Sequence, residues 1–211
     1  MKRPIVLLLM CFFAFTSFCQ TKRTGFTQLS VYTQMMEDTD YWDTMYQYFM
    51  KEQQYRYVCI TCPSFEPESC LVIGADSTLT LITLDKQIYS YLRSGKKDEK
   101  RPTASRKSLT VSANFVKDLQ NLIDLGSLTS NAYTSSRTLD GTTNYFLSYR
   151  RGFHSSKTHA DGKNANGGNE ACQLMVLINE IRDAVAGNKA FDEADLTTRV
   201  RKLHKHIYTL L

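Results

Sequence analysis

The sequence predicts an α+β domain in which about four helices pack on an antiparallel sheet of about five strands, formed by a meander and a hairpin. Short runs rich in β-branched and aromatic residues follow one another over 55–92, and the turns between them are too short for parallel crossovers. Elsewhere, apolar residues recur at helical spacing. No repeat with a period of about 20–50 residues is present, so the elements belong to a single domain.

The N-terminal segment 1–19 has the three parts of an export signal. Two basic residues open it, the almost unbroken apolar run Ile5–Phe15 follows, and small residues stand at Ser17 and Cys19, before a cut at Gln20. We expect cleavage there and a secreted or periplasmic protein of the bacterial cell envelope.

Two alternatives to this cleavage remain open. A retained membrane anchor disagrees with the length of the apolar run, which is shorter than the roughly 20 residues a spanning helix needs. A lipid on Cys19 disagrees with the bulky Phe18 before it. The remaining residues, 20–211, form the predicted domain, and we expect no transmembrane segment in them.

The charge of the chain is mild and concentrated in one stretch. The formal net charge is +5, which falls to +3 without Lys2 and Arg3, and this predicts no nucleic-acid partner. Arg93–Lys107 carries seven basic and two acidic residues and almost no apolar ones. We interpret 93–108 as a basic flexible connector. The alternative is that this segment binds an anionic glycan, a lipid head group or an acidic protein.

The first helix is expected over 31–53, where methionine and aromatic residues recur at helical spacing and Asp40 stands at a suitable N-cap position. This stripe is expected in the core. Its residues are Trp42, Met45, Tyr46 and Phe49.

Four strands of the meander follow. They are expected at Tyr55–Cys62, Cys70–Ile73, Thr78–Leu84 and Ile88–Leu92. Leu79 and Leu81 alternate with Thr80, so at least one face of the sheet should be covered.

After the connector, a helix is expected from an N-cap at Ser112 to a stop at Gly126. A hairpin over 133–150 turns at Asp140-Gly141, the favoured two-residue turn. The stretch 152–168 is expected as a long polar loop. Two amphipathic helices complete the domain, one from Asn169 to Gly187 and one from Asp192 to Leu211.

Four cysteines remain after removal of the signal: Cys59, Cys62, Cys70 and Cys172. An even number in an exported protein favours disulfides, and the preferred pairs are Cys62–Cys70 and Cys59–Cys172, with the other pairings left open. Catalytic redox chemistry at Cys59 and Cys62 would need a helix after the first cysteine. A zinc site would need a second ligand pair, so we expect no metal and no cofactor.

The 152–168 loop offers the weak catalytic candidates His154 and His159. On a mobile lid they would act as acid–base groups of an envelope hydrolase. Nucleophile, zinc-protease, P-loop and dinucleotide motifs are absent from the sequence, so we expect a non-catalytic protein and keep the hydrolase as the alternative.

Tyrosines near the predicted strands form the weak candidate for a binding face, with ordinary sheet packing as the alternative. These residues are Tyr55, Tyr57, Tyr89, Tyr91, Tyr145 and Tyr149. The sequence therefore predicts an exported binding or interaction protein, whose ligand is a partner protein, an envelope glycan or a toxin-type effector.

Overall fold

The computed structural model describes residues 27–28, 39–51, 55–94, 100–129, 142–148, 152–157 and 170–211. The predicted export signal lies outside these residues. The helices are α3 (Thr39–Phe49), α4 (Ile88–Ser94), α5 (Ala113–Leu128), α6 (Glu170–Ala186) and α7 (Glu193–Tyr208). The strands are β1 (Thr27–Gln28), β2 (Tyr55–Pro63), β3 (Ser69–Gly74), β4 (Thr78–Leu84), β5 (Ala104–Thr110), β6 (Thr142–Ser148) and β7 (Gly152–Lys157).

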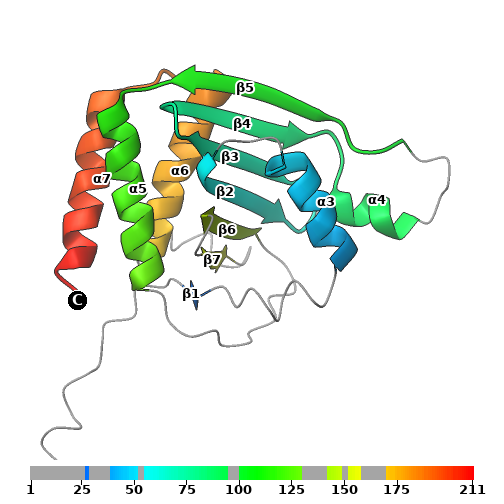
Figure 1. Ribbon diagram of the computed structural model, residues 1–211, viewed down its shortest axis with the longest axis horizontal. Coiled ribbons are helices and arrows are strands. Elements are labelled where there is room, and N and C mark those ends of the chain that lie inside the picture. Colours follow the sequence, from blue (N-terminus) through cyan, green and yellow to red (C-terminus); the bar gives the residue numbers. More distant parts are fainter. Residues whose placement is uncertain are drawn as a thin grey trace, which may run out of the picture.

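The strands of the described residues form one seven-stranded sheet in the order β1-β7-β6-β2-β3-β4-β5, and every neighbouring pair is antiparallel. Strands β2, β3 and β4 follow one another through short turns, as an antiparallel meander requires, and β5 joins the sheet beside β4 after helix α4. Helix α5 then carries the chain from the β5 edge back to β6, which lies beside β2 (Figure 1). The predicted α+β fold with an antiparallel sheet is confirmed.

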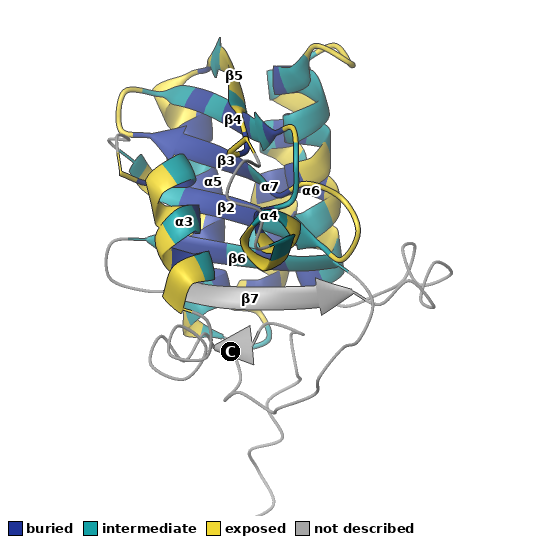
Figure 2. Cartoon of the chain, turned by 90° about the vertical axis from the view of Figure 1, so that its right-hand side faces the viewer, coloured by how far each residue is buried: buried dark blue, intermediate teal, exposed yellow. Residues whose placement is uncertain are grey.

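Helices cover both faces of the sheet. We call the side under α5, α6 and α7 the three-helix face and the side under α3 and α4 the two-helix face (Figures 1 and 2). Along β3, Leu71 and Ile73 join the core of the three-helix face, while Cys70 and Val72 join that of the two-helix face. The strand is apolar throughout because both sides of a covered strand are buried.

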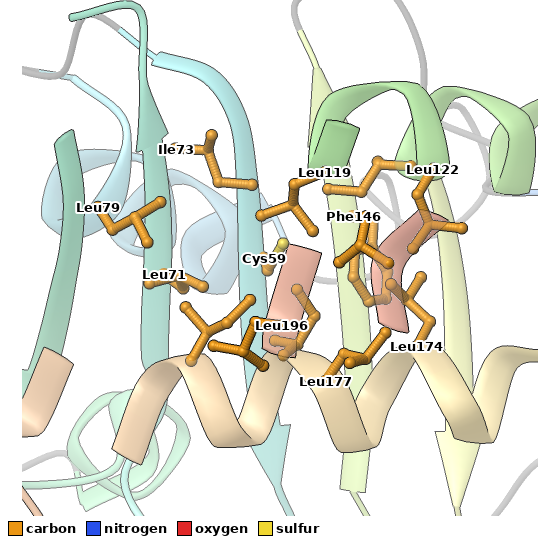
Figure 3. Close-up of a cluster of buried hydrophobic side chains, with 14 of the residues drawn as sticks. Cys59, Leu71, Ile73, Leu79, Leu119, Leu122, Phe146, Leu174, Leu177 and Leu196 are labelled. Atoms are coloured by element: carbon orange, nitrogen blue, oxygen red, sulfur yellow. The ribbon is translucent and has the colours of Figure 1, made fainter. Parts of the chain in front are cut away.

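The core of the three-helix face is the larger one. Figure 3 shows Leu119 and Leu122 of α5 with Leu174 and Leu177 of α6, packed around Phe146 of β6. On the other face, Trp42, Met45 and Phe49 of α3 are buried, which confirms most of the predicted stripe, but Tyr46 is exposed.

The segment Ile88–Leu92 is a helix and not the fourth strand of the meander. A short apolar run does not distinguish strand from helix by its period, and here Ile88 is buried while Tyr89 and Leu92 are exposed. The next strand after β4 is β5, which overlaps the predicted flexible connector 93–108 except at its last two residues. Its sequence is polar because β5 is the last strand of the described sheet and residues 105–108 are exposed.

The observed hairpin also differs from the one predicted over 133–150. Strand β6 pairs with β2 on one side and with β7 on the other, so both of its edges are occupied and no third strand can pair with it. The observed hairpin therefore joins β6 and β7, and residues 152–157 form a strand where a loop was expected. The Asp140-Gly141 turn and the expected first arm lie outside the described residues.

The predicted helix ends are mostly confirmed. Ser112 caps α5 by accepting a hydrogen bond from the Phe115 N–H at 3.1 Å, and Asp192 caps α7 by accepting one from the Asp195 N–H at 3.0 Å. Gly187 follows α6 with φ of 81°, a conformation that favours glycine. Gly126 is not a stop, because α5 continues to Leu128 and buries this residue.

Candidate functional site

The four cysteines of the described part of the chain form no disulfide with one another, so neither predicted bridge, Cys62–Cys70 or Cys59–Cys172, is present. The register of β2 and β3 pairs Cys70 with Ile60, which leaves Cys62 in a diagonal position on the two-helix face. Cys59 points to the three-helix face, and Cys172 is half-buried on α6.

Burial makes these thiols poor nucleophiles. Loss of hydration raises the pKa of Cys59 and of Cys62 to about 12, and it raises the pKa of Cys70 well above its ordinary value. Only the thiolate attacks disulfides or binds metals, so a raised pKa disfavours both kinds of chemistry at neutral pH. The Cys59 and Cys62 pair is therefore part of the packed sheet.

Of the two histidine candidates, the structure describes the backbone of His154. The backbone of His154 lies within β7, opposite Thr27 on β1 and Tyr145 on β6. This residue therefore belongs to the sheet and not to a mobile loop. His159 lies outside the described residues. In the part of the chain that the structure describes, no group of three or more histidine, cysteine, aspartate or glutamate residues is placed to hold a metal ion.

The six candidate tyrosines do not share one face. Tyr57 packs on the three-helix face, where its hydroxyl donates to Asp124. Tyr55 and Tyr145 lie on the two-helix face, and the ring of Tyr145 meets that of Trp42 edge-on at 5.0 Å between centroids. Tyr149 lies outside the described residues.

Helix α4 carries the other two candidates. Tyr89 is exposed, whereas Tyr91 is only partly exposed. Of the described candidates, Tyr89 is thus the one best placed for contact with a partner.

A buried carboxylate fixes α4 to the rest of the fold. Glu68, in the loop after β2, is only 2% exposed. Its Oε1 accepts a hydrogen bond from the Tyr41 hydroxyl and its Oε2 accepts one from the Ile88 N–H, both at 2.9 Å. One side chain therefore joins α3, the β2–β3 loop and the first turn of α4. Sequence reasoning missed it because an isolated acid in a loop carries no pattern.

The β2–β3 loop touches α4 a second time. The Gln87 side-chain amide donates to the backbone carbonyl of Ser64 at 3.0 Å, which places the loop against the start of α4. Tyr41 and Tyr89 also meet edge-on, with 6.5 Å between ring centroids. These contacts hold the loop and α4 in one fixed arrangement.

Large apolar side chains are exposed on this arrangement. Phe65 in the loop is 73% exposed, Tyr89 is 42% exposed and Leu92 is 36% exposed. We call these three residues the α4 surface; it lies on the outer side of the two-helix face, where Figure 2 shows α4. The guanidinium of Arg93 lies over the Tyr89 ring at 4.6 Å from its centroid.

Basic residues lie in α4 and beside it in the chain. They are Lys86, Arg93, Lys100 and Arg101, and the neighbouring acids in the chain among the described residues are Glu66 and Asp85. The Lys86 ammonium donates to the Lys100 carbonyl at 3.2 Å, and the Asp85 carboxylate accepts from the Thr103 N–H at 2.6 Å. These bonds attach the segment before β5 to the turn before α4. We call the four basic residues named above the basic rim of the α4 surface.

The Glu68 linkage leads to a stability prediction. An amide has one accepting oxygen, so Glu68→Gln should leave either the Tyr41 hydroxyl or the Ile88 N–H without an acceptor and lower the free energy of unfolding by about 1–3 kcal/mol. Tyr41→Phe removes one donor, so the double variant should lose less than the sum of the two single variants. Urea denaturation measures all three, and strictly additive losses would contradict the shared carboxylate.

A comparison with protein-family models, with curated proteins and with solved structures found no match to this chain. Among the helices of the described residues, none is both long and apolar enough to cross a membrane.

Proposed function

We propose that this protein is an exported, non-catalytic binding protein that contacts a partner protein through the α4 surface. The observation that carries the proposal is the exposure of Phe65, Tyr89 and Leu92 on one rigidly held arrangement. Interface centres are enriched in aromatic residues and arginine, which are also the residue types that contribute most to binding energy. Contiguous exposed apolar patches on soluble proteins often mark such contacts.

Rigidity supports the same proposal. Ordering a loop on binding costs free energy, and a surface already held in place avoids that cost. Glu68 and Gln87 fix the β2–β3 loop against α4 before any partner arrives. The α4 surface is therefore organised for contact.

The basic rim favours an acidic protein as the partner. Lys86, Arg93, Lys100 and Arg101 would attract an acidic surface, which would speed the encounter and fix its orientation. A glycan would be recognised mainly through hydrogen bonds to aromatic and polar side chains, and a basic rim adds little for a neutral sugar.

Export is part of the proposal and rests on segment 1–19. Intact mass of the protein recovered from periplasm or culture medium should correspond to a chain that begins at Gln20, and a mass that includes the segment would contradict cleavage. Cys59 and Cys70 are at most 3% exposed, which protects these two thiols in an oxidising compartment. The hydrolase alternative rests on His154 and His159, and the backbone of His154 lies in strand β7 and not on the expected loop.

A capture experiment with matched variants tests the α4 surface. The mature chain is immobilised and exposed to periplasmic extract and culture medium, and captured protein is quantified. One variant changes the α4 surface: Phe65→Ser, Tyr89→Ser and Leu92→Ser. The control variant changes exposed apolar residues of α5, α6 and α7: Leu128→Ser, Val176→Ser and Tyr208→Ser.

We expect the wild type and the control variant to capture the same acidic protein at stoichiometric yield. The α4 variant should lose at least tenfold in affinity, since removing one central aromatic anchor alone costs about 2 kcal/mol or more. Equal capture by both variants would overturn the proposal, and so would the absence of any stoichiometric partner while the protein remains folded.

A further inference from the structure

Strand β5 is a regular strand at the end of the described sheet. Its seven residues pair with those of β4 from Thr78↔Thr110 to Leu84↔Ala104, and the register has no shift. No neighbour is present on its other side among the described residues. A straight edge of this length can accept a further strand, because its outer backbone groups are already aligned.

The hydrogen bonds at both ends of β5 show which backbone groups point outward. The Val111 N–H donates to the Ser77 carbonyl, and the Thr103 carbonyl accepts from the Asp85 N–H. Backbone groups in a strand alternate between its two sides, so odd-numbered residues face β4. Ala104, Ser108 and Thr110 therefore direct their N–H and C=O groups away from the sheet.

Two cations lie at the centre of this edge, one on each face. Arg106 is opposite Ile82, whose side chain belongs to the two-helix face, and Arg106 is exposed. Lys107 is opposite Leu81 on the three-helix face, where its ammonium donates to the Ala186 carbonyl at the end of α6. A strand added here would meet positive charge on both of its faces.

We infer that the outer edge of β5 binds an extended acidic segment of the partner protein, which adds to the sheet as an eighth strand. The inference rests on the proposed binding function and names the chemistry of its partner. Backbone hydrogen bonds to residues such as Ser108 supply the pairing, and acidic side chains at consecutive positions of the segment meet Arg106 and Lys107.

The β5 edge is continuous with the α4 surface. Figure 1 shows β5 beginning on the side of the molecule where α4 lies, and the Asp85 carboxylate accepts a hydrogen bond from the Thr103 N–H just before β5 begins. A segment that follows the edge would therefore run past Lys100 and Arg101 toward the apolar centre. Both contacts can belong to one interface.

A second copy of this chain would bring like charges together in two symmetric pairings of β5. Antiparallel pairing of two β5 strands about their midpoint would place Lys107 opposite Lys107, and pairing one residue earlier would place Arg106 opposite Arg106. Like charges directly opposite each other destabilise a sheet. The charges of this edge thus disfavour these two pairings and favour an acidic strand.

Amide NMR of the mature chain tests the edge with a defined probe. The probe is a short synthetic peptide with two consecutive glutamates between flanks of threonine and valine, and the control peptide carries two lysines instead. We expect the glutamate probe to shift the amide signals of Ala104, Ser108 and Thr110, and the lysine peptide to leave them unchanged. No shift with the glutamate probe, or equal shifts with both peptides, would overturn the inference.

A pair of variants at one position isolates the backbone contact. Ser108→Pro removes an outward N–H, and Ser108→Ala keeps that N–H while both variants lose the hydroxyl contact with Thr80. We expect at least tenfold weaker probe binding by Ser108→Pro and an unchanged affinity for Ser108→Ala. Equal affinities in two folded variants would contradict strand addition.

Charge reversal provides the test if Ser108→Pro fails to fold. Arg106 is exposed, so Arg106→Glu should not disturb the fold. This variant should bind the glutamate probe about tenfold more weakly and the lysine peptide more tightly. An unchanged preference between the two peptides would overturn the charge argument. Concentration-dependent dimerisation of the wild type through β5, blocked by Ser108→Pro, would also overturn it in favour of a second copy.

These tests separate the inference from the proposed function. If the captured partner still binds the Ser108→Pro and Arg106→Glu variants but not the α4 variant, the α4 surface is the binding site and the β5 inference is wrong. If the glutamate probe binds β5 while the α4 variant captures as well as the wild type, the β5 inference stands and the α4 proposal is wrong.

Discussion

Raising the pH from 9 to 10 should lower the free energy of unfolding by about 2–3 kcal/mol through the buried thiols alone. Cys59 and Cys70 are at most 3% exposed, and burial raises the pKa of both, to about 12 for Cys59. In the unfolded chain a thiol has a pKa of about 8.5. Above pH 9 the unfolded state has therefore lost protons that the folded state keeps.

The sign follows from this difference. A pKa raised in the folded state gives stability that is complete below the unfolded pKa and is lost as the pH rises toward the folded pKa. Each such thiol contributes a slope of about 1.4 kcal/mol per pH unit between those limits. Cys62 is left out of the sum because part of its surface is exposed.

Urea denaturation at several pH values between 8 and 10 measures the slope. The matched control is Cys70→Ala, which removes one titrating group and should reduce the slope by about 1.4 kcal/mol per pH unit. The comparison uses slopes, so a lower overall stability of the variant does not disturb it. A slope in Cys70→Ala equal to that of the wild type would contradict the burial of a protonated thiol on β3.

Phe146→Ala should lower the free energy of unfolding by about 3–5 kcal/mol, because removal of a buried aromatic ring leaves a cavity that the surroundings fill only partly. Phe146 is 1% exposed and lies on central strand β6, where Figure 3 shows it among leucines of α5 and α6. Its loss would thus weaken the contact of two helices with the sheet.

The matched control is Phe65→Ala, an identical change on the α4 surface. Because Phe65 is mostly exposed, we expect its replacement to alter stability by less than about 0.5 kcal/mol. Urea denaturation compares the two variants. A loss below about 1 kcal/mol for Phe146→Ala would mean that α5 and α6 do not pack on β6 as described. A large loss of stability for Phe65→Ala would mean that Phe65 is buried and not part of the α4 surface.

Long amphipathic segments were predictable from the sequence. Helices α5, α6 and α7 each span four turns or more, so their apolar periodicity is clear, and the caps Ser112 and Asp192 mark their starts. The β2–β4 meander was equally clear because its strands are buried on both faces and separated by short turns.

Short and polar elements were not predictable in the same way. Helix α4 has only two turns, so its apolar residues fit a strand as well as a helix. Strand β5 carries a polar sequence because an outer position in the sheet needs few apolar side chains. The sequence of β7 is also mostly polar, and such sequences resemble loops. Their pairing depends on residues far away in the chain.

The candidate site was predicted only in part. Tyr89 was named among the tyrosines, but it was expected on a strand, and its companions Phe65 and Leu92 were not singled out. Their proximity arises from the hydrogen bonds of Glu68 and Gln87, which join the β2–β3 loop to α4. No local sequence pattern indicates such tertiary contacts. The predicted bridges, in contrast, are absent, and Cys59, Cys62 and Cys70 pack in or against the cores on the two faces of the sheet.

The central claim is that the α4 surface is the contact surface, and hydrogen exchange on the captured complex tests it most directly. Amide exchange is compared between the free chain and the complex, with peptides covering 64–66 and 86–94 on one side of the molecule and α5–α7 on the other. We expect slower exchange in the complex at the first two segments and no change over α5–α7. Protection confined to α5–α7, with α4 exchanging as in the free chain, would contradict it.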